Sequence, residues 1–124
     1  MNPYIHVIHD KFELIKTERD RRTQTGGYYV SSVGKWFHSD NLSRIQQIGL
    51  LLLGANIPAG LQWKTMDGTF ITMTQSLAAQ VFQAAATSDS TIFAYSSILY
   101  SNLQNAGNPV IFDVYAGWPK IFGE

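Results

Sequence analysis

The sequence predicts an α+β fold with an N-terminal helix, two β-hairpins that form one small antiparallel sheet, and two helices packed on it. Three observations predict this class. Apolar residues recur at helical spacing in residues 4–23 and again in residues 75–105. Two pairs of β-prone runs, in residues 28–39 and 61–74, each flank a short turn that contains glycine. A residue type that caps helices follows each pair, so each hairpin is expected to lead into a helix.

The length of the chain indicates one domain. A chain of 124 residues can bury a modest core, and we expect residues 1–124 to form a single domain. Residues 1–25 are its N-terminal helix. Residues 26–124 hold two hairpin–helix units and a C-terminal extended segment.

The N-terminal helix carries an apolar stripe in its first half only. Ile5, Ile8, Phe12 and Ile15 recur at helical spacing, and the same face becomes charged from Arg19 onward. Such a stripe needs a partner, which is either the chain's own sheet or another protein. We expect this helix either to project from the fold or to dock on it. Because its apolar stripe stops half-way, we take Ile5, Ile8, Phe12 and Ile15 as the predicted partner-binding residues.

The first hairpin is expected to turn at Val33-Gly34, either tightly or within a four-residue turn that keeps the same strands. Side chains alternate between the two faces of a strand. One face is therefore expected to carry Tyr29, Ser31, Trp36 and His38, and the opposite face Val30 and Phe37.

The helix after the first hairpin is expected to begin at a cap provided by Ser39 or Asp40. Its apolar residues lie at helical spacing, and we predict that they face the core. This predicted buried stripe consists of Leu42, Ile45, Gly49 and Leu52 or Leu53.

The second hairpin has the clearer turn signal, because Asp67-Gly68 separates its two β-prone runs. A two-residue turn places apolar residues on both faces, so we expect both faces to be covered. One face is predicted to hold Leu61, Trp63, Thr65, Phe70 and Thr72, and the other Gln62, Lys64, Met66, Ile71 and Met73.

The last helix is predicted over residues 75–105, with Thr74 or Ser76 at its start. Its apolar residues recur at near-heptad spacing, from Leu77 to Leu103. The segment TSDS at 87–90 contains weak helix formers, so the pattern is compatible with one continuous helix and with a kinked or divided one.

Composition excludes several classes of function. The chain carries no net charge, with nine basic and nine acidic residues, whereas a protein that binds nucleic acid electrostatically needs a basic excess. It contains no cysteine, which excludes disulfides, thiol catalysis and thiolate metal sites. Its longest apolar run, at 48–55, has eight residues and is too short to span a bilayer. The low charge and high aromatic content favour a protein that binds other proteins.

The candidates for chemistry have structural interpretations that we prefer. His38, Ser39 and Asp40 are consecutive on an extended segment, so their side chains diverge rather than converge as a catalytic group must. His6 and His9 could bind a metal with Asp10 or Glu13, but we interpret them as surface residues. We expect Asp40 to cap a helix and the ring of His38 to bond a backbone or carboxylate partner. The prediction is therefore a protein that is not an enzyme and has no cofactor and no metal.

Long motifs in the sequence resemble those of a small-domain family of undefined function, found in bacteriophage and prophage proteins within or beside tail-fibre genes. The resemblance covers about residues 11–124. Its motifs include the runs ERDRR, WFHSD, GLQWKT and GWP. They fall at Glu18–Arg22, Gly26-Gly27, Trp36–Asp40, Ser43-Arg44, Gln47, Gly49, Gly54–Asn56, Pro58, Gly60–Thr65, Thr72–Thr74 and Gly117–Pro119, and the side chains we take as its structural signature are Trp36, His38, Asp40, Arg44, Trp63 and Trp118.

This resemblance implies a phage tail-associated protein without known catalytic residues. We expect a tail-fibre assembly chaperone or accessory that binds a fibre or baseplate protein in the host cytoplasm. The alternative is an oligomeric structural component of the fibre or baseplate in the virion tail. A glycan-acting enzyme ranks below both, because the sequence shows no carboxylate pair. No nucleic acid or membrane partner is expected.

Overall fold

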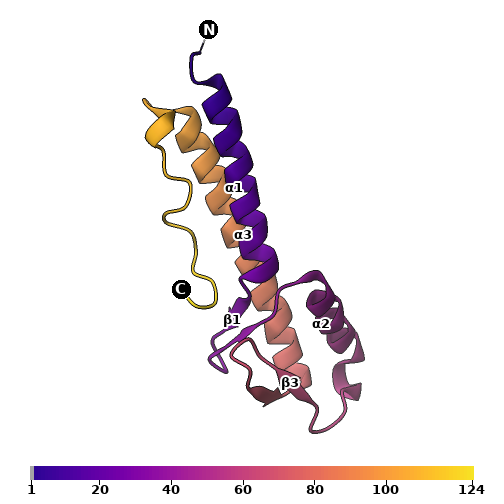
Figure 1. Cartoon of the computed structure of the whole chain (residues 1–124). Helices are drawn as coiled ribbons and strands as arrows, with labels where there is room; N and C mark the ends of the chain where they lie inside the picture. Colours follow the sequence, from indigo (N-terminus) through magenta and orange to yellow (C-terminus); the bar gives the residue numbers. More distant parts are fainter. Residues whose placement is uncertain (1) are drawn as a thin grey trace.

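A computed structural model describes residues 2–124 and confirms the α+β fold class with its N-terminal helix. Three helices and two short hairpins follow one another along the chain (Figure 1). Two single 3-10 turns, η1 and η2, complete the secondary structure. The elements are α1 (Ile5–Thr25), β1 (Tyr28–Val30), β2 (Lys35–Phe37), α2 (Asn41–Leu53), η1 (Gly54–Asn56), β3 (Gln62–Lys64), β4 (Phe70–Thr72), α3 (Gln75–Gln104) and η2 (Pro109–Ile111).

The molecule is elongated and α3 is its axis (Figure 1). Helices α1 and α3 run antiparallel and pack side by side in one half, so α1 does not project from the fold. In the other half, α2 and both hairpins gather around the first turns of α3. The C-terminal segment returns along the α1–α3 pair and ends near the first hairpin, where the amide of Phe122 donates to the carbonyl of Gly26 at 2.9 Å.

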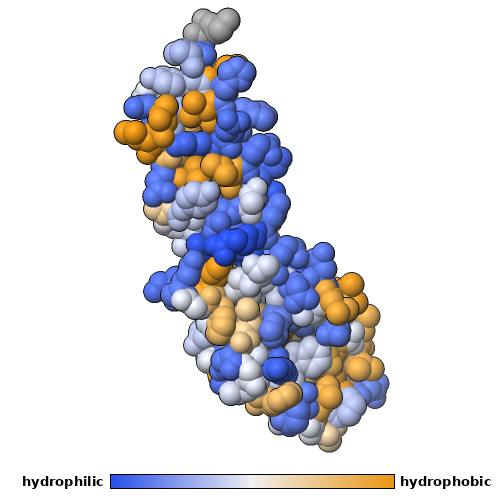
Figure 2. Space-filling model, viewed as in Figure 1, coloured by the Kyte–Doolittle hydropathy of each residue, from blue (hydrophilic) through white to orange (hydrophobic). Residues whose placement is uncertain are grey.

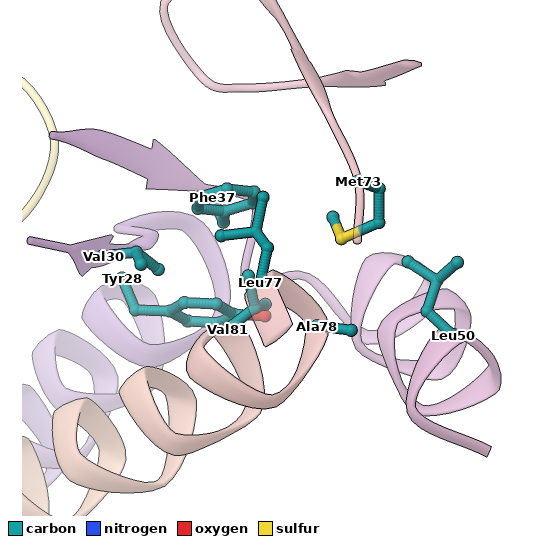
Figure 3. Close-up of a cluster of buried hydrophobic side chains, with 8 residues drawn as sticks. All are labelled: Tyr28, Val30, Phe37, Leu50, Met73, Leu77, Ala78 and Val81. Atoms are coloured by element: carbon teal, nitrogen blue, oxygen red, sulfur yellow. The ribbon is translucent and has the colours of Figure 1, made fainter. Parts of the chain in front are cut away.

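Two groups of buried side chains lie along α3. The first group joins the first hairpin and the end of the second hairpin to α2 and α3 (Figure 3). The second group joins α1 to α3 and the C-terminal segment. Because α3 contributes to both, it connects the two halves of the molecule. The first group is Tyr28, Val30, Phe37, Leu50, Met73, Leu77, Ala78 and Val81, and the second is Ile15, Ile92, Leu99, Leu103, Val114 and Trp118.

Helix α3 is continuous through the polar segment at 87–90. It spans 30 residues, which corresponds to about 45 Å. The side chain of Thr74 caps it by accepting from the amide of Leu77 at 3.1 Å. Within the polar segment, the carboxylate of Asp89 pairs with the guanidinium of Arg44. Weak helix formers are tolerated here because packed groups on both sides hold the helix and the charge has a partner.

The first hairpin has the predicted faces. Its strands pair Tyr29 with Trp36 across a four-residue turn, and Tyr28 with Phe37. This register differs by two residues from one centred on Val33-Gly34. Since side chains alternate with a period of two, a shift of two leaves every side chain on its predicted face.

The second hairpin differs from the prediction by one residue, which exchanges the faces of β4. Thr65 bonds to Thr69 across a three-residue loop, in which Gly68 has a φ of +85°. The carboxylate of Asp67 stabilises this loop by accepting from the amide of Thr69 at 3.0 Å. As a result Ile71 faces the core beside Trp63, and Phe70 turns outward.

The expectation of one joined sheet with both faces covered is also wrong for this hairpin. The structure has two separate two-stranded sheets, β1–β2 and β3–β4. A single backbone bond links them, from the amide of Met66 to the carbonyl of Trp36 at 2.9 Å, and Lys35 pairs with Asp67 at 2.8 Å. The outer face of β3–β4 is open, since Phe70 is 63% exposed. The three-residue loop places Trp63 and Ile71 together on the inward face. Covering that single face buries the apolar side chains that anchor the hairpin.

Candidate protein-binding surface

The predicted partner-binding stripe on α1 is used inside the chain. Ile15 is fully buried, and Ile8 and Phe12 pack against the second group of buried side chains. The ring of Phe12 meets that of Tyr100 on α3 edge-on, with centroids 5.1 Å apart. Only Ile5 remains largely exposed. Most of the stripe therefore packs within the chain, because α3 offers an apolar surface to Ile8, Phe12 and Ile15.

The charged half of α1 anchors the C-terminal segment. The guanidinium of Arg22 donates to the carboxylates of Glu18 and Glu124 and to the carbonyl of Pro119 at 2.8 Å. Hydrogen bonds from Arg21, opposed by burial and reinforced by Arg22, hold the pKa of Glu18 below its ordinary value. The ERDRR motif therefore has a structural role in this fold.

Trp118 belongs to the same arrangement. It is buried in the second group of side chains, and its indole nitrogen donates to the carbonyl of Val114 at 2.8 Å. Its ring also lies 5.7 Å from the guanidinium carbon of Arg22. These contacts join the GWP turn to α1.

Arg44 occupies the junction between the two halves of the molecule. Its guanidinium donates to the carbonyls of Ser39 and Thr23, at 2.5 and 2.7 Å, and to both carboxylate oxygens of Asp89. It also lies over the ring of Tyr28. One side chain thus ties α2 to α3, to the end of α1 and to the first hairpin.

Asp40 caps α2 as predicted. Its carboxylate accepts from the hydroxyl of Ser43 at 2.7 Å and from the amide of Ser43 at 3.1 Å. These bonds, with the side-chain bond foremost, lower the pKa of Asp40.

His38 differs from its prediction. Among the described residues, its ring accepts or donates no hydrogen bond, and it is its main-chain carbonyl that accepts from Gln47 at 2.8 Å. Of the two remaining tryptophans, Trp63 packs against the first group of buried side chains and Trp36 lies on the outer face of the first hairpin. Within residues 2–124, no three His, Asp or Glu side chains come together to hold a metal ion.

Helix α2 faces in the direction opposite to the predicted one. Gln47 and Leu50 are its buried residues, whereas Leu52 is 82% exposed and Ile45 is 66% exposed. The cause is polar. Arg44 and Gln47 lie on the inward side, where they satisfy carbonyl groups of the first hairpin, and the apolar stripe is therefore turned to solvent.

The outward stripe is hereafter called the α2 face. Figure 2 shows hydrophobic surface over the part of the molecule that holds α2. Gly49 lies within the stripe and has open space around it. The residues of the α2 face are Leu42, Ile45, Ile48, Leu52 and Leu53.

The α2 face is large and uncharged. With a fully exposed leucine or isoleucine taken as roughly 190 Å², its five residues present about 600 Å², at the upper end for the largest apolar patch on a monomer. No charged residue and no histidine occurs between Arg44 and Lys64. Large exposed apolar patches are typical of protein interaction sites, so the α2 face is the candidate functional site.

Sequence reasoning missed the α2 face because it assumed that the apolar side of an amphipathic helix is the buried side. The available signal was the pair Arg44 and Gln47, which lie three residues apart on one side of α2 and have long polar side chains. Their partners, however, come from distant parts of the chain.

In the part of the chain that the structure describes, no helix is long and apolar enough to cross a membrane. Comparison with known protein families matches residues 9–116 to the family described as "Domain of unknown function (DUF4376)". No match was found among curated proteins or among solved structures.

Proposed function

The chain belongs to the DUF4376 family of unknown function, and we propose that it is a non-enzymatic bacteriophage tail-associated protein. In this proposal it is an assembly chaperone or accessory that binds a fibre or baseplate protein through the α2 face. The tail association is supported by the motif resemblance of the sequence, and the binding mode by the surface of α2. A structural component of the tail that uses the same face is the alternative.

The exposure of the α2 face is the observation that carries this proposal. A standard protein interface buries about 800 Å² on each partner, and the α2 face supplies most of one such side. Complete burial of about 600 Å² would contribute about 15 kcal/mol, at about 25 cal/mol per Å², before the cost of association is subtracted. The absence of charge along the sequence of this face favours an apolar groove or helix as its counterpart.

The surroundings of α2 support the same proposal because they hold the helix rigidly. Asp40 caps its start, and Arg44 and Gln47 fix its inward side with bonds to main-chain carbonyls. A preformed helix loses little conformational freedom on binding, which favours affinity.

Three of the nine carboxylates of the chain are engaged in structural contacts, which agrees with the proposed non-enzymatic function. Asp67 accepts from Lys35 and two threonines, Asp89 pairs with Arg44, and Glu18 pairs with Arg21 and Arg22. Each is thus engaged in holding loops or helices together, whereas acid–base chemistry needs a carboxylate that faces a substrate.

Co-expression of the chain with tail-fibre and baseplate proteins tests the proposal. The tagged chain is purified and its partners are identified by mass. We expect one tail protein to co-purify with the native chain and to be lost with Ile45→Glu plus Leu52→Glu. Both positions are exposed, so far-UV circular dichroism and the melting temperature should not change.

Ile111→Glu is the matched control, since Ile111 is 79% exposed in η2, at the other end of the molecule from α2. The control should bind as the native chain does. Equal binding by the doubly substituted chain would exclude the α2 face, and co-purification of no tail protein would contradict the proposed function. Presence of the chain in purified virions in fixed ratio to the fibre would favour the structural alternative.

A further inference from the structure

A second surface feature lies away from the α2 face. It is a groove of about 430 Å³ between the first hairpin, the middle of α3 and the C-terminal segment at 119–120. Its volume falls within the range of small-molecule sites, about 300–1,000 Å³. The proposed function does not use this groove.

One wall of the groove is aromatic. Tyr29 and Trp36 line it, with ring centroids 5.4 Å apart. These rings lie on the outer face of the hairpin, opposite Tyr28 and Phe37, which belong to the core. Tyr29 is 48% exposed, so its ring surface is accessible to a ligand.

The opposite wall is a row of neutral polar side chains on α3. Gln80, Gln83, Thr87 and Thr91 recur at helical spacing, with Ser88 beside them. In residues 2–124, the amide of Gln83 and the hydroxyls of Thr87 and Ser88 make no hydrogen bond to other protein groups. They are therefore available both to donate and to accept.

Charge limits the class of ligand. Lys120 is the single charged residue among those lining the groove, and no carboxylate lines it. One lysine at the edge of a groove is too little for a polyanion, which needs several cationic contacts. A ligand that matches both walls must be neutral, rich in hydroxyl or amide groups, and have flat apolar faces.

We propose that this groove binds a neutral saccharide chain. The apolar C–H face of a sugar ring would lie on Trp36 and Tyr29, and its hydroxyl groups would bond to Gln83, Thr87 and Ser88. The volume admits a short oligosaccharide. An extended peptide is the competing ligand, but the α3 wall offers side-chain amides and hydroxyls rather than apolar pockets for alternate side chains.

The test uses the full chain and a printed panel of neutral and anionic glycans, followed by titration of every retained glycan with isotope-labelled protein in an NMR experiment. We expect at least one neutral glycan to bind with Kd at or below about 1 mM. The amide signals of residues 29, 36 and 83–91 should shift, and signals of α2 should not.

Two variants locate the site. Trp36→Ala should weaken binding at least about tenfold. Since Trp36 also packs within the fold, Gln83→Ala is the second variant, because an exposed helix position without hydrogen bonds tolerates alanine. Gln104→Ala, at the far end of the same helix, is the control and should bind normally.

Retention of no neutral glycan would overturn the proposal. So would binding that is confined to anionic glycans, or binding that is unchanged by both Gln83→Ala and Trp36→Ala.

Discussion

Replacement of Arg44 by methionine should lower the free energy of unfolding by about 3 kcal/mol, because four hydrogen bonds depend on one guanidinium. Methionine keeps much of the aliphatic packing but leaves the carbonyls of Ser39 and Thr23 and the carboxylate of Asp89 without this donor. The side chains of Arg44 and Asp89 are 22% and 33% exposed. Water therefore replaces part of the loss, and we expect a value at the lower end of the roughly 3–5 kcal/mol typical of a fully buried pair.

A double-mutant cycle separates the ion pair from the carbonyl contacts. Asp89→Asn keeps an acceptor but removes the charge, so it should cost about 1 kcal/mol. The double substitution should cost less than the sum of the two single ones, by about 1 kcal/mol, because Asp89→Asn removes a charge whose partner is already absent in Arg44→Met.

Urea unfolding of the four proteins measures these differences. At a slope near 2 kcal/mol per molar urea, Arg44→Met should move the midpoint down by about 1.5 M. Lys16→Met is the control, since Lys16 and Glu13 are half-exposed, and it should change stability by less than about 0.5 kcal/mol. Additive losses for Arg44 and Asp89, within about 0.3 kcal/mol, would refute the reasoning.

Three further predictions concern stability. The hydroxyl of Tyr28 is buried without a hydrogen-bond partner in the described chain. Tyr28→Phe should therefore leave the free energy of unfolding unchanged or raise it by about 1 kcal/mol. A loss of more than about 1 kcal/mol in urea unfolding would show that the hydroxyl has a partner in solution. Bonds from Arg21 and Arg22 lower the pKa of Glu18 in the folded state. The stability that ionised Glu18 contributes is therefore fully present above its ordinary pKa of 4.5 and is lost as the pH falls through its lower pKa in the folded state. The urea midpoint should drop on acidification, and it should drop less in Glu18→Gln. Gly117 has a φ of +85° and its added Cβ would meet the hydroxyl of Tyr95, so Gly117→Ala should lower the melting temperature by several degrees in calorimetry, and an unchanged value would contradict this.

Local features of the fold were predictable from the sequence. The cap at Asp40 depends on residues within three positions of it, and the helical spacing around α1 and α3 needs only the neighbouring turns. The first hairpin kept its faces even though its turn was longer than the tightest form, because its register shifted by an even number of residues.

The second hairpin shows where local rules end. Asp67-Gly68 predicts a turn in either register, and a two-residue and a three-residue loop differ by one residue. The hairpin adopts the three-residue loop, in which Trp63 and Ile71 share the face toward the core and Asp67 accepts a hydrogen bond inside the loop. The three-residue loop is favoured over the two-residue loop only when the hairpin packs against the core.

The sequence by itself determined which segments become helices and strands, where α2 and α3 begin, and which side of α1 and α2 is apolar. Tertiary structure alone decided what each apolar side meets. The stripe of α1 found a surface on α3, whereas α2 was turned outward by Arg44, whose partner Asp89 lies 45 residues away. Spacing along a chain identifies the two faces of a helix, but contacts between distant residues decide which face is buried.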